Sequence, residues 1–198
     1  MTDSERAQAD ARWPVAVRFG GLGGQGLVTL GAVLAQAGAE AGLRVAASQS
    51  YGSRARGGAT RADVILSAAE IDFPHVHHPD LLLVLAQEAY ELYAPAVAAG
   101  GAVLADSFFV RQQDPPPGVR LLRLDATGTA LSVVGNKVAA NFVMLGALLG
   151  FTGLLEAAAV ETAIGALVRP RFQALNRQAL AEGLERGRAL AAGGEPWR

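Results

Sequence analysis

Two glycine-rich segments hold the residues best suited to binding chemistry. Residues 20–26 read Gly-Gly-Leu-Gly-Gly-Gln-Gly, and residues 51–58 read Tyr-Gly-Ser-Arg-Ala-Arg-Gly-Gly. The first contains the spacing G-x-G-x-x-G, which marks a strand–turn–helix that can hold a phosphate. Each segment is expected to follow one of the first two strands. If those strands are neighbours in a parallel sheet, both segments lie at one edge and form a single site for an anionic group.

Each residue of the first segment has an expected part in such a site. Gly21 would allow the tight turn, Gly23 would let a phosphate approach the backbone, and Gly26 would let the helix pack close to its strand. Gly24 and Gln25 lie at the start of the helix, where N–H groups and a partial positive charge favour an anion. The alternative is a tight strand–helix turn that binds no ligand.

The acid that usually accompanies this glycine spacing in dinucleotide-binding proteins is missing. A carboxylate roughly 20 residues further on, at the end of the second strand, normally holds the ribose. Here residues 47–50 read Ala-Ser-Gln-Ser, and the only carboxylate between Gly26 and Asp63 is Glu40, inside the expected helix. NAD binding is therefore disfavoured.

The second segment brings two cations next to freely bending backbone. Arg54 and Arg56 are two residues apart, so in an extended loop they would point the same way and could clamp a phosphate or carboxylate. Tyr51 offers an aromatic face and a hydroxyl, and Gly57 and Gly58 close the loop. The alternative is a pair of solvated arginines on a flexible loop.

A third group of polar residues lies in the C-terminal part of the chain. Asn136 is a natural N-cap for a helix that starts at Lys137, and Lys137 could serve an anion at that helix start. Asn141 and Asn176 lie within apolar helical stretches, so each needs a hydrogen-bond partner if it is buried.

All three histidines lie close together, at positions 75, 77 and 78. With Asp72 or Asp80 they could bind a metal ion, but the segment precedes a buried strand and implies no rigid geometry. A surface loop is the favoured interpretation, and we expect no metal site.

The composition narrows the class of protein. The chain has 198 residues, of which 51% are hydrophobic and 18% charged, and its net charge is -1, which gives no electrostatic case for nucleic acid. It has no Cys, which excludes a cysteine-ligated iron–sulfur cluster within the chain. Residues 138–155 carry no charge, but their Asn, Thr and Gly content favours a buried helix over a membrane span. The polar N-terminus shows no signal peptide, and we expect a cytoplasmic protein.

The sequence also lacks the motifs of self-sufficient enzymes. There is no G-x-S-x-G elbow, no P-loop, no H-E-x-x-H and no evident cluster of acids and bases, so no catalytic residue is expected. The low charge content indicates that a partner covers part of the surface. These features favour a binding or assembly subunit.

The apolar patterning predicts the elements that position these residues. Strands are expected at 15–19, 44–50, 61–67, 81–85, 102–105 and 119–124, and helices at 24–41, 88–99, 127–134, 137–149, 154–168 and 171–192. Because a parallel crossover needs about a dozen residues or more, the short 51–60 connection makes the third strand antiparallel to the second. The fold class is α/β, a Rossmann-like three-layer domain with a mostly parallel sheet, one antiparallel strand and a helical C-terminal third. Residues 1–13 are expected to be a mobile arm, 14–192 a single domain and 193–198 a tail.

Taken together, the motifs resemble the gamma subunit of 2-oxoacid:ferredoxin oxidoreductases. Residues 21–26 match the family pattern G-x-G-G-Q-G, and residues 51–58 match Y-G-x-E-x-R-G-G, with Arg54 in place of the usual Glu and Arg56 as the matching arginine. Further matches include Asn136-Lys137, Asn141 and Asn176 with its spacing to Gly183. The resemblance covers residues 15–185, and the 2-oxoglutarate branch looks closest.

The resemblance implies a reaction carried out by a complex. A 2-oxoacid, 2-oxoglutarate first and pyruvate next, is decarboxylated on thiamine diphosphate with Mg²⁺, electrons pass through iron–sulfur clusters to ferredoxin, and an acyl-CoA is formed. Alpha and beta subunits, and a ferredoxin-like delta subunit in some complexes, would hold most cofactors. This chain would shape the channel, and its loops would hold coenzyme A (CoA) phosphates or contact the thiamine-binding subunit. The residues expected to do so are Gly21, Gly23, Gly24, Gln25, Gly26, Tyr51, Arg54, Arg56, Gly57, Gly58, Asn136 and Lys137.

Three other functions remain open at this stage. The chain could be a stand-alone Rossmann-type nucleotide-binding oxidoreductase, although the missing ribose acid argues against that. It could be a purely structural subunit whose loops make only protein contacts. Within the family, it could belong to an enzyme of the arylpyruvate type.

Overall fold

The centre of the molecule is a six-stranded sheet in the order β2-β3-β1-β4-β5-β6. The computed structural model describes residues 12–50, 58–111, 114–193 and 197. The strands are β1 (Val15–Leu22), β2 (Arg44–Ser50), β3 (Ala59–Ser67), β4 (Leu81–Val84), β5 (Ala102–Asp106) and β6 (Arg120–Leu124). β3 is antiparallel to both its neighbours, and the remaining pairs are parallel. The fold class and the single antiparallel strand are confirmed.

The first two strands are not neighbours, which corrects one expectation. β3 lies between them and pairs with β2 on one side and β1 on the other. Because both β1 and β2 run opposite to β3, they run in the same direction and end at the same edge of the sheet. The two glycine-rich segments therefore leave from one edge, separated by the width of one strand.

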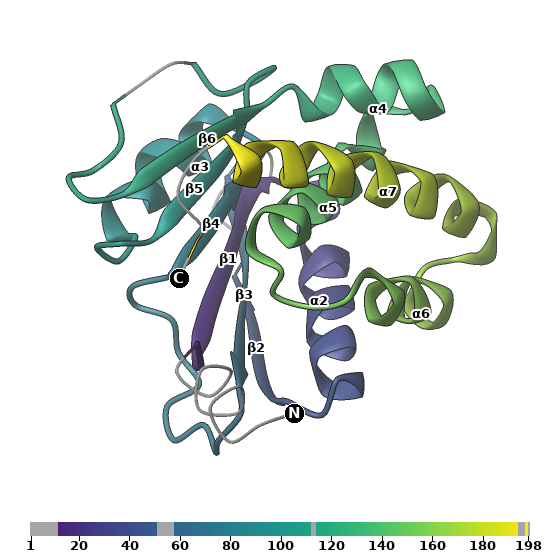
Figure 1. Cartoon of the computed structure of the whole chain (residues 1–198). Helices are drawn as coiled ribbons and strands as arrows, with labels where there is room; N and C mark the ends of the chain where they lie inside the picture. Colours follow the sequence, from purple (N-terminus) through teal and green to yellow (C-terminus); the bar gives the residue numbers. More distant parts are fainter. Residues whose placement is uncertain (1–11, 51–57, 112–113, 194–196, 198) are drawn as a thin grey trace.

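Helices cover both faces of the sheet and give a three-layer arrangement (Figure 1). The helices are α2 (Leu27–Glu40), α3 (Gln87–Tyr93), α4 (Ala126–Val134), α5 (Ala140–Thr152), α6 (Ala157–Leu167) and α7 (Pro170–Ala192), with short 3₁₀ turns η1 (Ala94–Ala96) and η2 (Lys137–Ala139). α2, α5, α6 and α7 lie on one side, and α3 lies on the other. The helix expected at 88–99 is shorter than predicted because Pro95, which has no N–H to donate, turns its end into η1.

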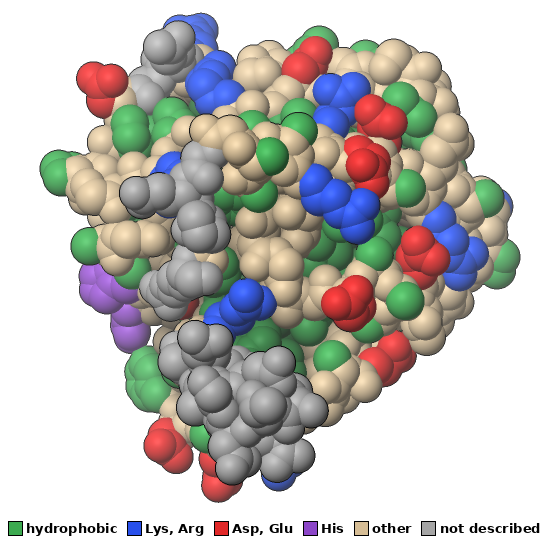
Figure 2. Space-filling view, viewed as in Figure 1, with side chains coloured by type: hydrophobic (Ala, Val, Ile, Leu, Met, Phe, Trp, Pro, Cys, Tyr) green, Lys and Arg blue, Asp and Glu red, His purple; other side chains and the backbone are tan. Residues whose placement is uncertain are grey.

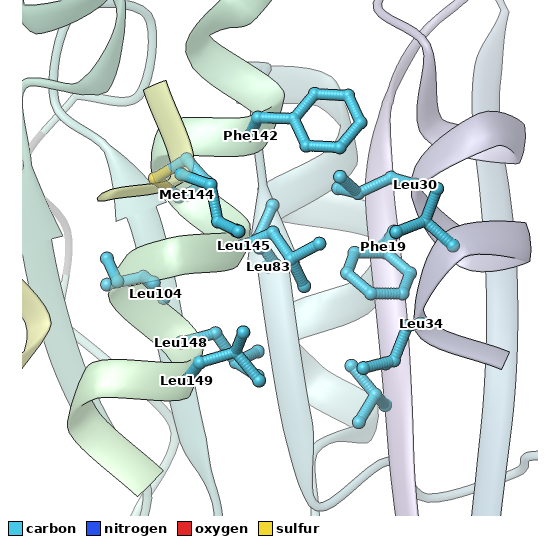
Figure 3. Close-up of a cluster of buried hydrophobic side chains, with 14 of the residues drawn as sticks. Phe19, Leu30, Leu34, Leu83, Leu104, Phe142, Met144, Leu145, Leu148 and Leu149 are labelled. Carbon is cyan, nitrogen blue, oxygen red and sulfur yellow. The ribbon is translucent and has the colours of Figure 1, made fainter. Parts of the chain in front are cut away.

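The main core forms where α5 packs between the sheet and α7. Nearly every residue of α5 is buried, and its side chains meet those of β1, β4 and α2 around Phe19, Leu83 and Phe142 (Figure 3). α5 ends at Gly153, whose φ of 58° is the left-handed conformation that glycine adopts readily. No described helix combines the length and apolarity needed to cross a membrane, in keeping with the buried helix predicted here.

Glycines let α5 and α7 approach until their backbones touch. A Cβ on Gly146 or Gly150 of α5 would collide with the backbone of α7 at Leu180 or Leu184. A Cβ on Gly183 or Gly187 of α7 would collide in the same way with the backbone of α5. The close packing of α5 against α7 therefore depends on residues without side chains.

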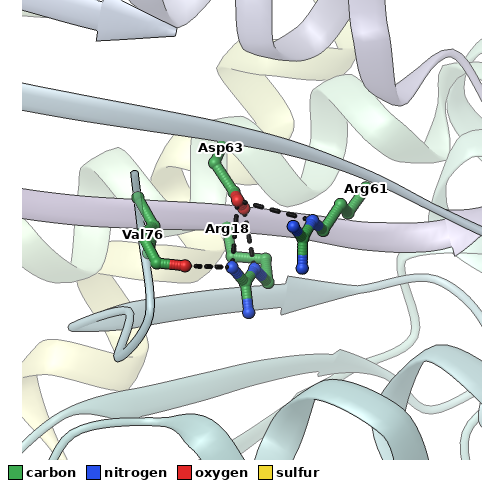
Figure 4. Close-up of polar contacts among 4 residues, drawn as sticks. All are labelled: Arg18, Arg61, Asp63 and Val76. Atoms are coloured by element: carbon green, nitrogen blue, oxygen red, sulfur yellow. Dashed lines mark hydrogen bonds and ion pairs between the residues drawn. The ribbon is translucent and has the colours of Figure 1, made fainter. Parts of the chain in front are cut away.

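A buried ion pair joins β1 to β3 across the antiparallel ladder (Figure 4). Arg18 donates from Nε to Asp63 Oδ1 at 2.7 Å and from Nη2 to Asp63 Oδ2 at 2.9 Å, and both side chains are only 3% exposed. Arg18 Nη2 also donates to the Val76 carbonyl at 2.6 Å, and Arg61 Nε lies 3.6 Å from Asp63 Oδ2. The pair thereby fixes the histidine-containing segment to the sheet.

Candidate functional site

The carboxyl ends of the parallel strands meet at one pocket of about 260 Å³. The loops after β1, β4 and β5 and the starts of α4 and η2 supply its walls. It is lined by Gly23, Gly24, Gln25, Leu85, Phe109, Thr127, Lys137, Val138, Ala140 and Asn141. Crevices at the carboxyl ends of strands are where open α/β sheets bind ligands. The pocket brings the first glycine-rich segment together with Lys137, although these residues are more than a hundred positions apart.

The Gln25 side chain holds the first glycine-rich segment in shape. Its Oε1 accepts a hydrogen bond from the Leu22 N–H at 2.6 Å, and its Nε2 donates to the Leu85 carbonyl at 2.8 Å. Both ends of the amide are therefore used to tie the loop to β1 and β4. Gln25 therefore lines the pocket, and its side-chain amide has a structural role.

The glycines of this segment differ from their expected roles in two places. Gly21 belongs to β1 itself, where a Cβ would collide with the Gln25 amide, while the turn that follows contains Gly24 at a φ of 91°. Gly26 has a φ of 75°, and a Cβ there would lie 2.5 Å from Asn141 Nδ2, so it makes room for α5 rather than for the strand. The close approach of α2 to the sheet depends instead on Gly31, whose added Cβ would lie 2.9 Å from that of Ala62.

Gly23, like Gly24, is an open position of the segment. A Cβ added at Gly23 would meet no atom of the described residues within 4 Å, and its backbone conformation is one that other residues adopt. The backbone at Gly23 is consequently exposed to whatever enters the pocket.

Asn141 connects the C-terminal helices to the glycine-rich segment. It is buried, and its Nδ2 donates to the Gln25 carbonyl at 3.1 Å while its Oδ1 accepts from the Phe142 N–H at 2.8 Å. The sequence indicated that a buried Asn141 needs a hydrogen-bond partner, but it did not identify that partner. Asn136 caps η2 as predicted, since its Oδ1 accepts from the Val138 N–H at 3.0 Å. Lys137 is exposed at the pocket and forms no ion pair with any described residue.

Asp106 anchors the far wall of the pocket. Its carboxylate is fully buried and accepts hydrogen bonds from the N–H groups of Phe108 and Ala126 and from the N–H and Oγ1 of Thr127. Burial raises the pKa of Asp106, and the four hydrogen bonds oppose that rise. The carboxylate thus holds the start of α4 against the loop that carries Phe109.

Most of the second glycine-rich segment lies outside the described residues. Tyr51, Arg54, Arg56 and Gly57 are not described, and Gly58 is. Gly58 precedes Ala59, which pairs with Leu22 at the end of β1. Gly58, the described end of the second glycine-rich segment, is therefore close to the first glycine-rich segment where β1 ends.

The histidines lie in a loop at the edge of the molecule, where Figure 2 shows their side chains grouped. His75 and His77 pack against the Phe73 ring, with centroid distances of 5.2 and 5.6 Å, and His78 Nδ1 lies 3.2 Å from the Ala96 carbonyl. Within the described part of the chain, no group of three or more potential metal ligands comes together.

Comparison with known families identifies the family of the chain. The profile of the pyruvate ferredoxin/flavodoxin oxidoreductase family matches residues 16–186, most of the chain. The chain belongs to this family. The resemblance to the gamma subunit seen in the motifs is thereby confirmed.

Individual relatives agree with this assignment. The 2-oxoglutarate synthase subunit KorC of Methanothermobacter marburgensis is 38% identical over 175 residues, which cover 85% of this chain and 94% of the relative. The pyruvate synthase subunit PorC of Methanocaldococcus jannaschii is 32% identical over 155 residues, covering 76% of this chain and 84% of the relative. Among solved structures, the gamma subunit of a keto/oxoacid ferredoxin oxidoreductase from Geobacter sulfurreducens superposes with a TM-score of 0.78 at 37% identity, covering 88% of this chain and 99% of that one.

Family membership and strand order also explain why the glycine spacing occurs without a ribose acid. In a dinucleotide-binding domain the second strand is next to the first and ends with a carboxylate near the ribose. Here β3 occupies that neighbouring position, and β2 ends in Gln49 and Ser50 one strand further away. The geometry therefore disfavours the alternative of a stand-alone dinucleotide-binding oxidoreductase.

Sequence reasoning assigned no role in the site to three residues that shape this region. Asp106 and Thr127 form a buried pair behind the pocket, and Phe109 lines it. An acid that ends an apolar strand is a usable signal for Asp106, because the carboxyl end of a parallel strand is where sites form. Nothing in the local sequence marks Phe109.

Proposed function

We propose that this chain is the gamma subunit of a 2-oxoglutarate:ferredoxin oxidoreductase. The complex would convert 2-oxoglutarate and CoA to CO₂ and an acyl-CoA, with the electrons passed to ferredoxin. The choice of 2-oxoglutarate rests on one observation: this chain has higher sequence identity and coverage with the KorC relative than with the PorC relative. Pyruvate is the second candidate.

The residue types present in this chain indicate which cofactors of the complex its partners would hold. The chain has no Cys to ligate an iron–sulfur cluster, and no carboxylate of the described residues lines the pocket to hold Mg²⁺ on a diphosphate. The site does not fit thiamine diphosphate or a cluster, and we assign both to the alpha, beta and delta partners. A cytoplasmic location stays a prediction.

The pocket fits part of CoA better than it fits thiamine diphosphate or an iron–sulfur cluster. Lys137 supplies a cation, the backbone at Gly23 and Gly24 can approach an oxyanion, and Phe109 and Val138 offer an apolar wall for the uncharged stem. On sequence grounds we add Tyr51, Arg54, Arg56, Gly57 and Gly58 to the same phosphate-binding role. In this function the chain binds and orients CoA, and no residue of it takes part in bond making.

The function is tested by purifying the complex through a tag on this chain from its native source. The eluate is assayed for CoA-dependent reduction of a viologen dye with 2-oxoglutarate, pyruvate and branched-chain 2-oxoacids. We expect larger subunits to co-purify and 2-oxoglutarate to be the best substrate. A chain recovered without other subunits and without activity would refute the proposal, and preference for pyruvate would change the substrate alone.

The CoA role predicts a specific kinetic change in the Gly23→Ala variant of the complex. The new methyl group meets no described atom within 4 Å, so the unfolding temperature should stay unchanged, while the KM for CoA should rise about tenfold because the backbone is shielded from the phosphate. Gly26→Ala is the contrasting variant. Its φ of 75° and its contact with Asn141 predict a lower unfolding temperature. An unchanged KM in Gly23→Ala would assign the segment to protein contacts instead.

A further inference from the structure

A second pocket, of about 420 Å³, adjoins the first and shares Val138 and Asn141 with it. It lies between η2, α5 and the turn from α6 to α7. It is lined by Gly26, Thr29, Asn136, Val138, Ala139, Asn141, Phe142, Leu167, Val168, Arg169, Phe172, Leu175 and Asn176. We call this pocket the apolar groove, because its rim is formed by Val138, Leu167 and Phe172.

The rim of the apolar groove exposes large apolar side chains to solvent. Val138 is 51% exposed, Leu167 45% and Phe172 37%. Phe109, at the adjoining first pocket, is also exposed and stacks edge-on against exposed Phe108, with ring centroids 4.9 Å apart. Most large apolar side chains that are exposed in the described part of the chain gather here. A continuous patch of this kind marks an interaction surface, whereas single exposed apolar residues do not.

The charged side chains that line the apolar groove and the adjoining pocket are cations. Arg169 lines the groove, Lys137 lies at the adjoining pocket, and the Arg171 guanidinium lies 4.6 Å from the centre of the Phe172 ring. No carboxylate lines either pocket, and none of these three cations forms an ion pair with a described residue. A partner that covers the groove must therefore supply carboxylates if these cations are to be paired.

Asn176 gives the apolar groove a polar group near its floor that a partner could bind. It is only 9% exposed, it lines the groove, and its side chain makes no hydrogen bond to any described residue. Buried amide side chains are nearly always hydrogen-bonded, by protein or by water. An occupant that excludes water from the groove has to offer Asn176 a donor or an acceptor.

We propose that the apolar groove is the docking surface for another subunit of the oxidoreductase complex. The matching segment carries an apolar side chain for the rim of Val138, Leu167 and Phe172, carboxylates for Arg169 and Arg171, and a backbone or amide group for Asn176. A second copy of this chain fits poorly, because a two-fold contact through the groove would place the same cations opposite one another. This inference rests on the proposed function and adds the surface through which the chain assembles.

The proposal is tested with tagged variants expressed in the native source. Leu167→Glu places a carboxylate in the rim, and Leu92→Glu is the matched control, since Leu92 is 60% exposed on α3 at the opposite face of the sheet. We expect Leu167→Glu to reduce the co-purified subunits at least about tenfold, and Leu92→Glu to leave them at the wild-type level. Arg169→Glu, which changes an exposed and unpaired side chain, should give a smaller loss in the same direction.

The outcomes separate this inference from the proposed function. If wild type recovers an active complex and both Leu167→Glu and Arg169→Glu do so equally well, the groove is not the docking surface although the function stands. If wild type recovers no subunit, function and docking surface fail together. Sedimentation of the isolated chain is the last measurement: a dimer that Leu167→Glu dissociates would assign the groove to a second copy and overturn the proposal.

Discussion

Replacement of Asp63 by alanine is expected to lower the free energy of unfolding by about 3–5 kcal/mol. The variant leaves the Arg18 guanidinium buried with no counter-charge, because both side chains are 3% exposed and Asp63 accepts two of its hydrogen bonds. The remaining bond to the Val76 carbonyl cannot neutralise the charge. Urea unfolding followed by circular dichroism measures the difference.

Arg61→Ala is the matched control for this prediction. Arg61 also faces Asp63, but at 3.6 Å and with its own side chain 39% exposed, so its loss should cost at most about 1 kcal/mol. Removing both partners of the buried pair, as in Arg18→Met with Asp63→Leu, should recover much of the stability, since apolar side chains need no counter-charge. Equal stability of Asp63→Ala and wild type would show that the pair adds nothing to the fold.

The second large effect is expected at the contact between α5 and α7. Gly183→Ala should cost about 3 kcal/mol or more, because the new methyl group would collide with the Val143 carbonyl and lie 2.8 Å from the Val143 carbonyl carbon, so only a shift of backbone can relieve it. A shift of α7 would also open the core beneath it. Thermal and urea unfolding should both show the loss.

Gly165→Ala on α6 serves as the comparison, because the same substitution there meets only a flexible side chain. The nearest atom to the added Cβ is Arg177 Nη2 at 2.9 Å, which can move away at little cost. Alanine favours a helix over glycine by up to about 1 kcal/mol, so this variant should be as stable as wild type or more so. If the two variants behaved alike, the close approach of α5 and α7 would not depend on glycine.

The candidate site shows where sequence reasoning succeeds and where it stops. The spacing of the first glycine-rich segment predicted a strand–turn–helix, because the turn needs left-handed backbone that glycine adopts readily, as at Gly24 and Gly26. The capping role of Asn136 was also predictable, since an Asn before a helix satisfies a nearby N–H. The parts played by Gly21 and Gly26 were misjudged, because the groups that approach them, the Gln25 amide and Asn141, reach them only in the folded chain.

The sequence by itself determined the fold class, most element positions and the family. These depend on signals that are local in the chain: apolar periodicity, glycines at turns, the short link that makes β3 antiparallel, and motifs in a fixed order. Only the tertiary structure decided that β3 separates β2 from β1, that Arg18 pairs with Asp63, that Asn141 holds the Gln25 carbonyl, and that Asn176 faces the apolar groove. Each of these joins residues far apart in sequence. Such contacts are set by which surfaces can pack without voids or unpaired polar groups, and that choice is made by the whole chain at once.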